Sequence, residues 1–279
     1  MRPIGAPSGS GRRVPLEVVT HEPGDDASAI HRFRYQVYLT ELGWTSADAD
    51  HDSRTLCDAL DDHAVLHSLT DGNQILGTVR TVHAAWLPDL SLIEKTGALA
   101  GVERFGAEAV VTTGRFMLAP ELRGGTAILR LIIAAADAMR EAGIRLNYGD
   151  TSPQLLPFYE HLGYRRFAWP FTDPDYGWKF PILMLVRDQK RMAAMGSPLR
   201  RVFAGLPDDA EARDWFEATY SHSLEERSER FRGRHEFRRL VESTLGSLAD
   251  TRFSTVWPRK NCTRYLPLRP LCPPGPGTR

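Results

Sequence analysis

Cysteine is scarce in this sequence, and long hydrophobic runs are absent from it. The 279 residues include three cysteines, which are widely spaced and fit no zinc-ligand pattern. No apolar run approaches the roughly 20 residues that a membrane-spanning helix requires. Residues 1–13 lack the hydrophobic core of a signal peptide and are expected to form a disordered leader. We therefore expect a reduced, cytoplasmic protein with no bound metal and no membrane span.

An excess of charge of either sign is also absent. The chain has 35 Lys and Arg against 35 Asp and Glu, which gives a formal net charge of zero. Proteins dedicated to nucleic acids normally carry a basic excess that displaces counterions. No nucleic-acid partner is therefore expected. With 42% hydrophobic residues, the chain can bury the core of one large domain and an appendage.

Hydrophobic periodicity predicts an α/β fold with one sheet wrapped by helices. A first strand at 16–19 precedes a helix that Asp25 or Asp26 can cap and Gly43 can end. The segment Asp71-Gly72-Asn73 is typical of a hairpin turn. Further strands are expected at 63–69, 74–83, 110–118, 145–149, 164–169 and 178–186, and further helices at 126–140 and 153–161.

The character of the sequence changes after about residue 196. Residues 196–255 predict a helical C-terminal extension, and the proline-rich residues 256–279 predict a disordered tail. Within the extension, 222–245 form a strongly charged helical pattern. That helix is either a solvated surface or a basic face for an acidic carrier protein.

The strongest functional signal lies at residues 114–125. A hydrophobic strand ends in a turn at Pro120, and the loop Arg123-Gly124-Gly125-Thr126 then opens directly into a helix. Unpaired backbone N–H groups and the positive end of the helix dipole meet at such a point, which makes it an anion site. The alternative is that the double glycine is only a flexible turn.

This segment, followed by residues 156–164, resembles the GNAT N-acyltransferase superfamily. The resemblance implies a mixed, mostly antiparallel twisted sheet flanked by helices over residues 14–190. In that family the first segment cradles the pyrophosphate or pantetheine arm of an acyl thioester, and the second packs around the thiol end. The donor-binding residues implied are Phe116, Met117, Leu118, Arg123, Gly124, Gly125 and Thr126.

The glycine loop matches the superfamily pattern only in part, because Thr126 and Ile128 stand at its two later positions. Both acyl-CoA and an acyl-phosphopantetheine carrier therefore remain candidate donors. Tyr159 stands where many GNAT enzymes carry a tyrosine that protonates the leaving thiolate, which implies a catalytic role. The alternative for Tyr159 is an aromatic core residue beside Phe158.

A narrower resemblance links the N-terminal half to acyl-homoserine-lactone synthases and related N-acyl amino acid synthases. It rests on the spacing of Arg34, Tyr38, Trp44, Asp58, Asp61, Arg80 and Arg115. The three arginines would face the two aspartates in an ion network that orders a lid; ordinary solvated ion pairs are the alternative. The resemblance implies catalytic roles for Arg115 and Asp61. Substrate contacts are implied for Arg34, Tyr38, Trp44, Arg80 and, on the last hairpin, Trp169.

One departure affects the expected chemistry. Autoinducer synthases carry a glutamate three residues before the central-strand arginine, and that position holds Thr112 here. We therefore do not expect a homoserine lactone product. The sequence leaves the general base open among a water chain and the side chains of Glu41, Asp61, Asp62, His83 and Asp150.

Together these patterns predict an N-acyltransferase. It would move an acyl group from acyl-CoA or an acyl carrier protein to a small-molecule primary amine by direct attack. An acetyl-CoA-dependent acetyltransferase is one alternative. A non-catalytic acyl-thioester sensor on the same scaffold is another.

Overall fold

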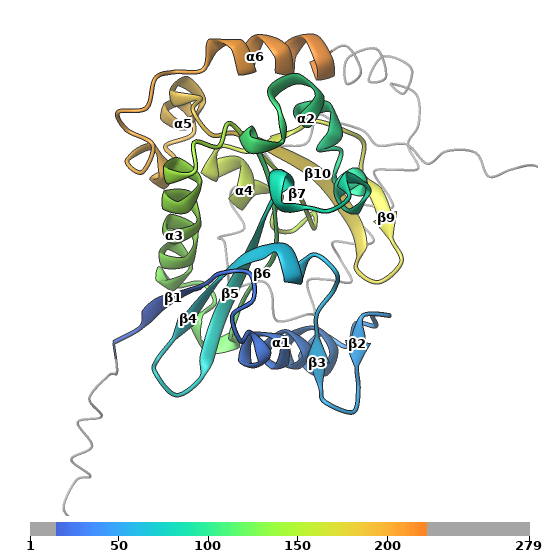
Figure 1. Cartoon of the computed structure of the whole chain (residues 1–279). Coiled ribbons are helices and arrows are strands. Elements are labelled where there is room, and N and C mark those ends of the chain that lie inside the picture. Colours follow the sequence, from blue (N-terminus) through green and yellow to red (C-terminus); the bar gives the residue numbers. More distant parts are fainter. Residues whose placement is uncertain (1–14, 222–279) are drawn as a thin grey trace, which may run out of the picture.

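The computed structural model describes residues 15–221 (Figure 1). Its main sheet has the strand order β1-β4-β5-β6-β7-β10-β8, with β9 paired to β10. All pairs are antiparallel except β6 with β7, which run parallel. The strands are β1 (Glu17–His21), β4 (Ala64–Thr70), β5 (Ile75–His83), β6 (Val110–Leu118), β7 (Leu146–Thr151), β8 (Arg165–Arg166), β9 (Phe171–Asp173) and β10 (Gly177–Leu185). A separate ribbon pairs β2 (Ala49–Asp50) with β3 (Thr55–Leu56).

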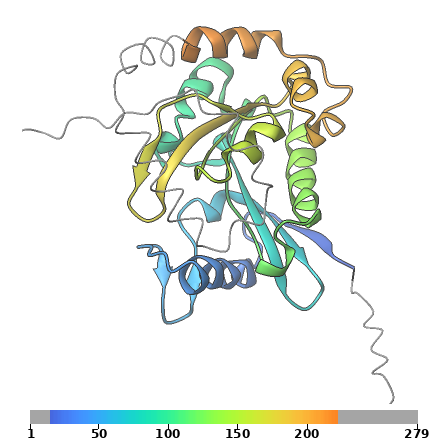
Figure 2. The ribbon, with the colours of Figure 1, turned by 180° about the vertical axis from the view of Figure 1, so that it is seen from behind.

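Helices cover both faces of this sheet. The α-helices are α1 (Ser28–Tyr35), α2 (Leu99–Phe105), α3 (Ala127–Glu141), α4 (Leu156–Leu162), α5 (Gln189–Ala194) and α6 (Ala210–Phe216). A π-helical segment, η1 (Gln36–Glu41), continues α1. In both views α3 stands beside the sheet and α1 lies next to the β2–β3 ribbon (Figures 1 and 2). This arrangement is the α/β, GNAT-like fold that the sequence predicted.

Strand alternation divides the core between the two faces. Val111 belongs to the core beneath α3, α4 and α5, whereas its neighbour Val110 belongs to the core beneath α2 and α6. A third cluster, which includes Ile30 and Val82, lies under α1. The described part of the predicted extension packs on the second core through Ala212 and Phe216. The leader, the charged helix at 222–245 and the tail lie outside the described residues, and the domain boundaries stay predictions.

Several predicted elements are confirmed. The central strand β6 spans 110–118 as expected, and α3 ends before Gly143, which adopts a φ of +72°. In the hairpin turn, the Asp71 carboxylate accepts the backbone N–H groups of Asn73 and Gln74, and Gly72 has a φ of +88°. These features are local, so the sequence specifies them directly.

Three predicted boundaries are wrong. The strand at 164–169 shrinks to Arg165–Arg166 because its partner strand carries Pro181, which has no N–H for the ladder. The helix at 153–161 begins at Leu156, so that Pro157 occupies its first turn. The first helix has Ala27 at its N-cap, and Asp26 instead accepts the N–H of Ser28.

The two central strands separate halfway along their length. β6 pairs with β7 only from Val110 to Thr112, opposite Leu146 to Tyr148. At Gly149 a Cβ atom would lie 2.8 Å from the carbonyl oxygen of Thr113, so only glycine fits at the point of separation. The second half of β6 therefore borders a gap in the sheet, and this gap positions the candidate site.

Candidate functional site

A β-bulge gives the second half of β6 its shape. Gly114 lies opposite Arg80 and Met117 opposite Thr78, so Arg115 and Phe116 share the place opposite Val79. Arg115 adopts a φ of +51°, which is uncommon for a residue with a side chain. The bulge turns Arg115 toward the α1 face of the sheet, whereas Phe116 packs against the core beneath α3 and α4.

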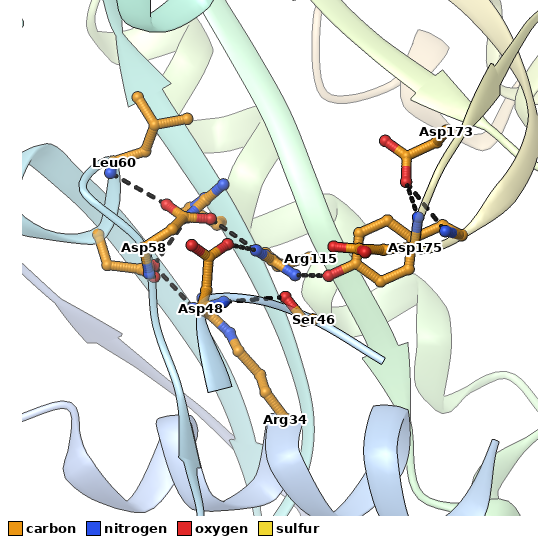
Figure 3. Close-up of polar contacts among 11 residues, drawn as sticks. Arg34, Ser46, Asp48, Asp58, Leu60, Arg115, Asp173 and Asp175 are labelled. Atoms are coloured by element: carbon orange, nitrogen blue, oxygen red, sulfur yellow. Dashed lines mark hydrogen bonds and ion pairs between the residues drawn. The ribbon is translucent and has the colours of Figure 1, made fainter. Parts of the chain in front are cut away.

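The predicted ion network is confirmed (Figure 3). Asp58 accepts hydrogen bonds from Arg80 at 2.5 Å and from Arg115 at 2.6 Å. Asp61 accepts one from Arg34 at 2.7 Å and lies 3.1 Å from Arg80. The Arg34 side chain is fully buried and that of Asp61 is 4% exposed, so these are not solvated surface pairs.

Electrostatics keep both aspartates ionised. Burial alone would raise the pKa of Asp58, but the charges of Arg80 and Arg115 outweigh it and hold this pKa well below its usual range. Burial would likewise raise the pKa of Asp61, but the charges of Arg80 and Arg34 outweigh burial and lower this pKa. Because Asp61 is committed to two arginines, it is poorly suited to accept a proton from a substrate.

Arg115 also joins the network to an aromatic cluster, which we define as Tyr38, Trp44 and Tyr176. One guanidinium N–H donates to the Tyr176 hydroxyl at 2.7 Å, and the guanidinium carbon lies 5.8 Å from the Tyr38 ring centre. The three rings lie 5.0–5.5 Å apart, centre to centre. Lys179 completes the group, because its ammonium lies 5.2 Å from the Tyr176 ring centre.

Sequence reasoning named neither Tyr176 nor Lys179 as a site residue. The carboxylate of Asp173 accepts the backbone N–H groups of Asp175 and Tyr176 and so fixes the turn that presents Tyr176 (Figure 3). The Asp-Pro-Asp-Tyr-Gly sequence that forms this turn was an available signal. Trp169 was predicted at the substrate site; its indole N–H is buried and has no hydrogen-bond partner within residues 15–221.

Tyr159 lies on the opposite face of the gap. It lines a small, mostly apolar cavity of about 30 Å³ together with Thr113, Phe116, Asn147, Phe158 and Tyr164. The Asn147 amide donates to the Tyr164 hydroxyl at 2.8 Å. Burial, ahead of the neighbouring charges, raises the pKa of Tyr159 above its ordinary value. Its hydroxyl therefore stays protonated at neutral pH and can donate a hydrogen bond.

The predicted donor loop follows β6. Gly124 has a φ of +79°, which glycine alone adopts freely, and Thr126 precedes the first turn of α3 without capping it through its side chain. The Arg123 guanidinium forms a two-pronged ion pair with Glu41, and its Nε–H donates to the carbonyl of Leu118 at 2.9 Å. The implied phosphate ligand Arg123 thus already holds an anion from the chain itself.

The remaining candidates for a base lie in different surroundings. His83 stacks on Trp86 with ring centres 4.1 Å apart, and burial lowers its pKa. Asp62 is exposed next to the network. Asp150 lies 2.9 Å from the ammonium of Lys179, beside the aromatic cluster. Thr112, which stands where autoinducer synthases carry a glutamate, is buried between Val82 and Tyr148.

Neither a metal centre nor a membrane span emerges from the described part of the chain. Residues 15–221 contain no group of three His, Cys, Asp or Glu side chains arranged to hold a metal ion. No helix within the same range is both long enough and apolar enough to cross a bilayer.

Comparison with known proteins agrees with this geometry. Residues 33–133 match the family model described as an acetyltransferase (GNAT) domain. Residues 33–133 thus match a GNAT domain, and the resemblance to the GNAT superfamily stated from the sequence is confirmed over that range. No curated protein sequence matches the chain.

TofI and BjaI, two solved structures with TM-scores above 0.5, share the fold. TofI, crystallised with an inhibitor and MTA, is 19% identical, with a TM-score of 0.51 over 67% of this chain and 99% of TofI. BjaI, a CoA-dependent acyl-homoserine lactone synthase solved with SAM and isopentyl-CoA, is 15% identical, with a TM-score of 0.52 over 66% of this chain and 91% of BjaI. FeeM, an N-acyl amino acid synthase from uncultured soil microbes, is 14% identical, with a TM-score of 0.49 over 67% of this chain and 98% of FeeM.

We predict that the Asp61→Asn substitution destabilises the protein strongly. It leaves the fully buried Arg34 without its closest countercharge, and breaking a buried ion pair on one side costs about 3–5 kcal/mol. The free energy of unfolding in urea at pH 7 should fall by about 3 kcal/mol. The matched control Asp137→Asn removes a partner of an exposed pair with Arg140 and should change it by less than about 0.5 kcal/mol.

The effect should depend on pH. The pKa of Asp61 is lower in the folded chain than in the unfolded one, so its stabilisation is complete above the unfolded pKa of about 3.9. It is lost as the pH falls from there toward the folded pKa. The difference between wild type and Asp61→Asn should therefore shrink as the pH falls below about 4, and a constant difference there would contradict the assignment.

Proposed function

We propose that this protein transfers an acyl group from a CoA or carrier-protein thioester to a primary amine. The main observation that supports this proposal is the separation of β6 from β7. Tyr159 lies on one side of the gap, and the aromatic cluster with Arg115 lies on the other. In a direct transfer, the amine nitrogen must reach the carbonyl carbon of the thioester from a side that the sulfur and its pantetheine arm do not occupy. In the described fold, the gap is where two such approaches would meet.

For the donor, the pantetheine arm would run along the part of β6 that β7 does not pair. Backbone groups of Phe116, Met117 and Leu118 would bind its amides and polarise the thioester carbonyl. The phosphate groups would reach the loop of Arg123, Gly124, Gly125 and Thr126 at the start of α3. Because Arg123 is bound to Glu41, phosphate binding requires that it exchange one anion for the other.

On the thiol side, the buried hydroxyl of Tyr159 would protonate the leaving thiolate. The neighbouring cavity limits the acyl group. At about 30 Å³ it has room for little more than a water molecule or a methyl group. This volume favours the second candidate function, an acetyl-CoA-dependent acetyltransferase, since a longer chain requires the surrounding side chains to move.

For the acceptor, the aromatic cluster offers apolar ring surface beside two cations. Tyr38 and Trp44 would contact an apolar or aromatic group, and Arg115 or Lys179 would attract a carboxylate. Arg80 would act by holding Asp58, which binds Arg115. Arg34 would act one step further away, by holding Asp61, whose carboxylate accepts the backbone N–H of Asp58. An amino-acid-like amine with an apolar side chain fits this description, so L-phenylalanine and phenethylamine are suitable probes.

The donor class is tested first by thermal shift with acetyl-CoA, decanoyl-CoA and a decanoyl carrier protein. A ligand at a hundred times its Kd adds about 2.7 kcal/mol of stability, which moves the melting temperature by several degrees. A shift with acetyl-CoA alone supports acetylation, and a shift with decanoyl donors supports a long-chain synthase. No shift with any of them would sink the donor site.

We predict that Tyr159→Phe separates an enzyme from a sensor. Loss of the proton donor should lower kcat by about 100-fold while the Kd for the donor stays within twofold. Tyr35→Phe is the control, since its hydroxyl bonds His51 at 2.9 Å on an exposed part of α1. A sensor would show no transfer to L-phenylalanine or phenethylamine with either variant or with wild type, and equal donor affinity in all three.

We also predict that Glu41→Gln tightens donor binding. A neutral side chain competes less well for Arg123, so the Kd for acetyl-CoA should fall several-fold, up to about tenfold or 1.4 kcal/mol. S-acetylpantetheine, which has no phosphate, should bind the variant and wild type equally. Glu103→Gln changes an exposed carboxylate on α2 and serves as the charge control. An unchanged Kd for acetyl-CoA would contradict a phosphate role for Arg123.

A further inference from the structure

Transfer to an amine leaves one proton to be removed. When the nitrogen attacks the thioester carbonyl it becomes positively charged and must lose a proton before the amide forms. Thr112 cannot accept it, because a neutral hydroxyl is a very weak base and this one is buried in the ladder between β5 and β7. The proton must therefore go to another group that reaches the same side of the gap.

Asp150 lies at the corresponding place on the other side of the gap. Strand alternation puts it on the same face of β7 as Tyr148, which packs in the core beneath α2. Thr112 lies on that face of β6, because Val110, two residues earlier, packs in the same core. Tyr148 is the last β7 residue paired with β6, so Asp150 follows just past the point where the strands separate.

Its contacts direct Asp150 toward the aromatic cluster. The carboxylate binds the ammonium of Lys179 at 2.9 Å, and the same ammonium lies 5.2 Å from the ring centre of Tyr176. Lys179 reaches it diagonally across the ladder, since Asp150 pairs with Pro181. The Asp150 side chain is 40% exposed, so one side of it stays open to a ligand. Its charge also contributes, after burial, to the raised pKa of Tyr159 across the gap.

The other acidic and basic candidates are committed elsewhere. Glu41 lies against Arg123 at the donor loop, beside the proposed phosphate site and not beside the reacting carbonyl. Asp61 is bound to two arginines, and His83 is stacked on Trp86 near the opposite end of β6. Asp62 lies with the network at the start of β4 rather than on β7.

We propose that Asp150 is the general base of the acyl transfer, an inference that rests on the function proposed above. The amine nitrogen forms the new C–N bond and its proton passes to the Asp150 carboxylate. The C–S bond breaks, and the sulfur takes the proton of the Tyr159 hydroxyl. The proton on Asp150 then returns through solvent to the Tyr159 phenolate. The net products are one amide and one free thiol, with both side chains restored.

The assignment is tested with Asp150→Asn, acetyl-CoA, and L-phenylalanine or phenethylamine as acceptor, with release of free thiol and formation of the amide both measured. We expect kcat to fall by 100- to 1,000-fold and the Kd for acetyl-CoA to stay within twofold. Asp137→Asn on α3 makes the same charge change away from the gap and should keep wild-type kcat.

A second variant separates a base from a residue that only shapes the site. Asp150→Ala removes the carboxylate and opens space that a small carboxylate can enter from solvent. Formate at tens of millimolar should raise the kcat of Asp150→Ala at least tenfold and should leave the kcat of wild type unchanged. Chloride at the same ionic strength should not raise the kcat of Asp150→Ala. Normal kcat in Asp150→Asn, or a loss that formate does not restore, would overturn the assignment.

Failure of the underlying function gives a different result. If wild type acylates neither amine, the proposed transfer fails, and the base is then assayed by the slow hydrolysis of acetyl-CoA, in which water replaces the amine. A slower hydrolysis in Asp150→Asn than in wild type supports the assignment. An equal rate in the two proteins overturns it.

Discussion

The contact between Asp58 and Arg115 is the interaction on which the rest of the site depends. Arg115 lies in a left-handed conformation within a β-bulge, a backbone state that costs about 1–3 kcal/mol for a residue with a side chain. Two charge-assisted contacts offset that cost, one to Asp58 at 2.6 Å and one to the Tyr176 hydroxyl at 2.7 Å. Arg80 in turn fixes Asp58 from the next strand. Without the Asp58 carboxylate, Arg115 would lose the main contact that stabilises its left-handed conformation.

The bulge and the separation of the strands make one arrangement. Past Thr112, β6 is released from β7, and the bulge then sends Arg115 and Phe116 to opposite faces. One face receives the apolar wall with Tyr159, and the other receives cations and aromatic rings. A thioester lying in the gap would present its sulfur toward one chemistry and its carbonyl carbon toward the other. Neither face alone would supply both the proposed acid, Tyr159, and the proposed contacts to the acceptor.

Local patterns explain how far the sequence could be interpreted. The hairpin at 71–73 and β6 follow from turn chemistry and apolar runs, and the ion network follows from arginine spacing that the family resemblance supplied. The contacts of Glu41 with Arg123 and of Asp150 with Lys179 could not be predicted from the sequence. They join residues that are 82 and 29 positions apart and lie on different elements. The predicted length of β8 was wrong for a similar reason, since this length depends on Pro181 in another strand. The base could be named only after the gap was located.

The ion pair between Glu41 and Arg123 connects the two halves of the site. Glu41 is the last residue of η1, and Tyr38 of the aromatic cluster lies three residues before it in the same segment. Arg123 belongs to the proposed donor loop, so this pair links that loop to the segment that carries Tyr38. A donor phosphate that takes Arg123 away from Glu41 removes that link while Arg34 stays anchored by Asp61.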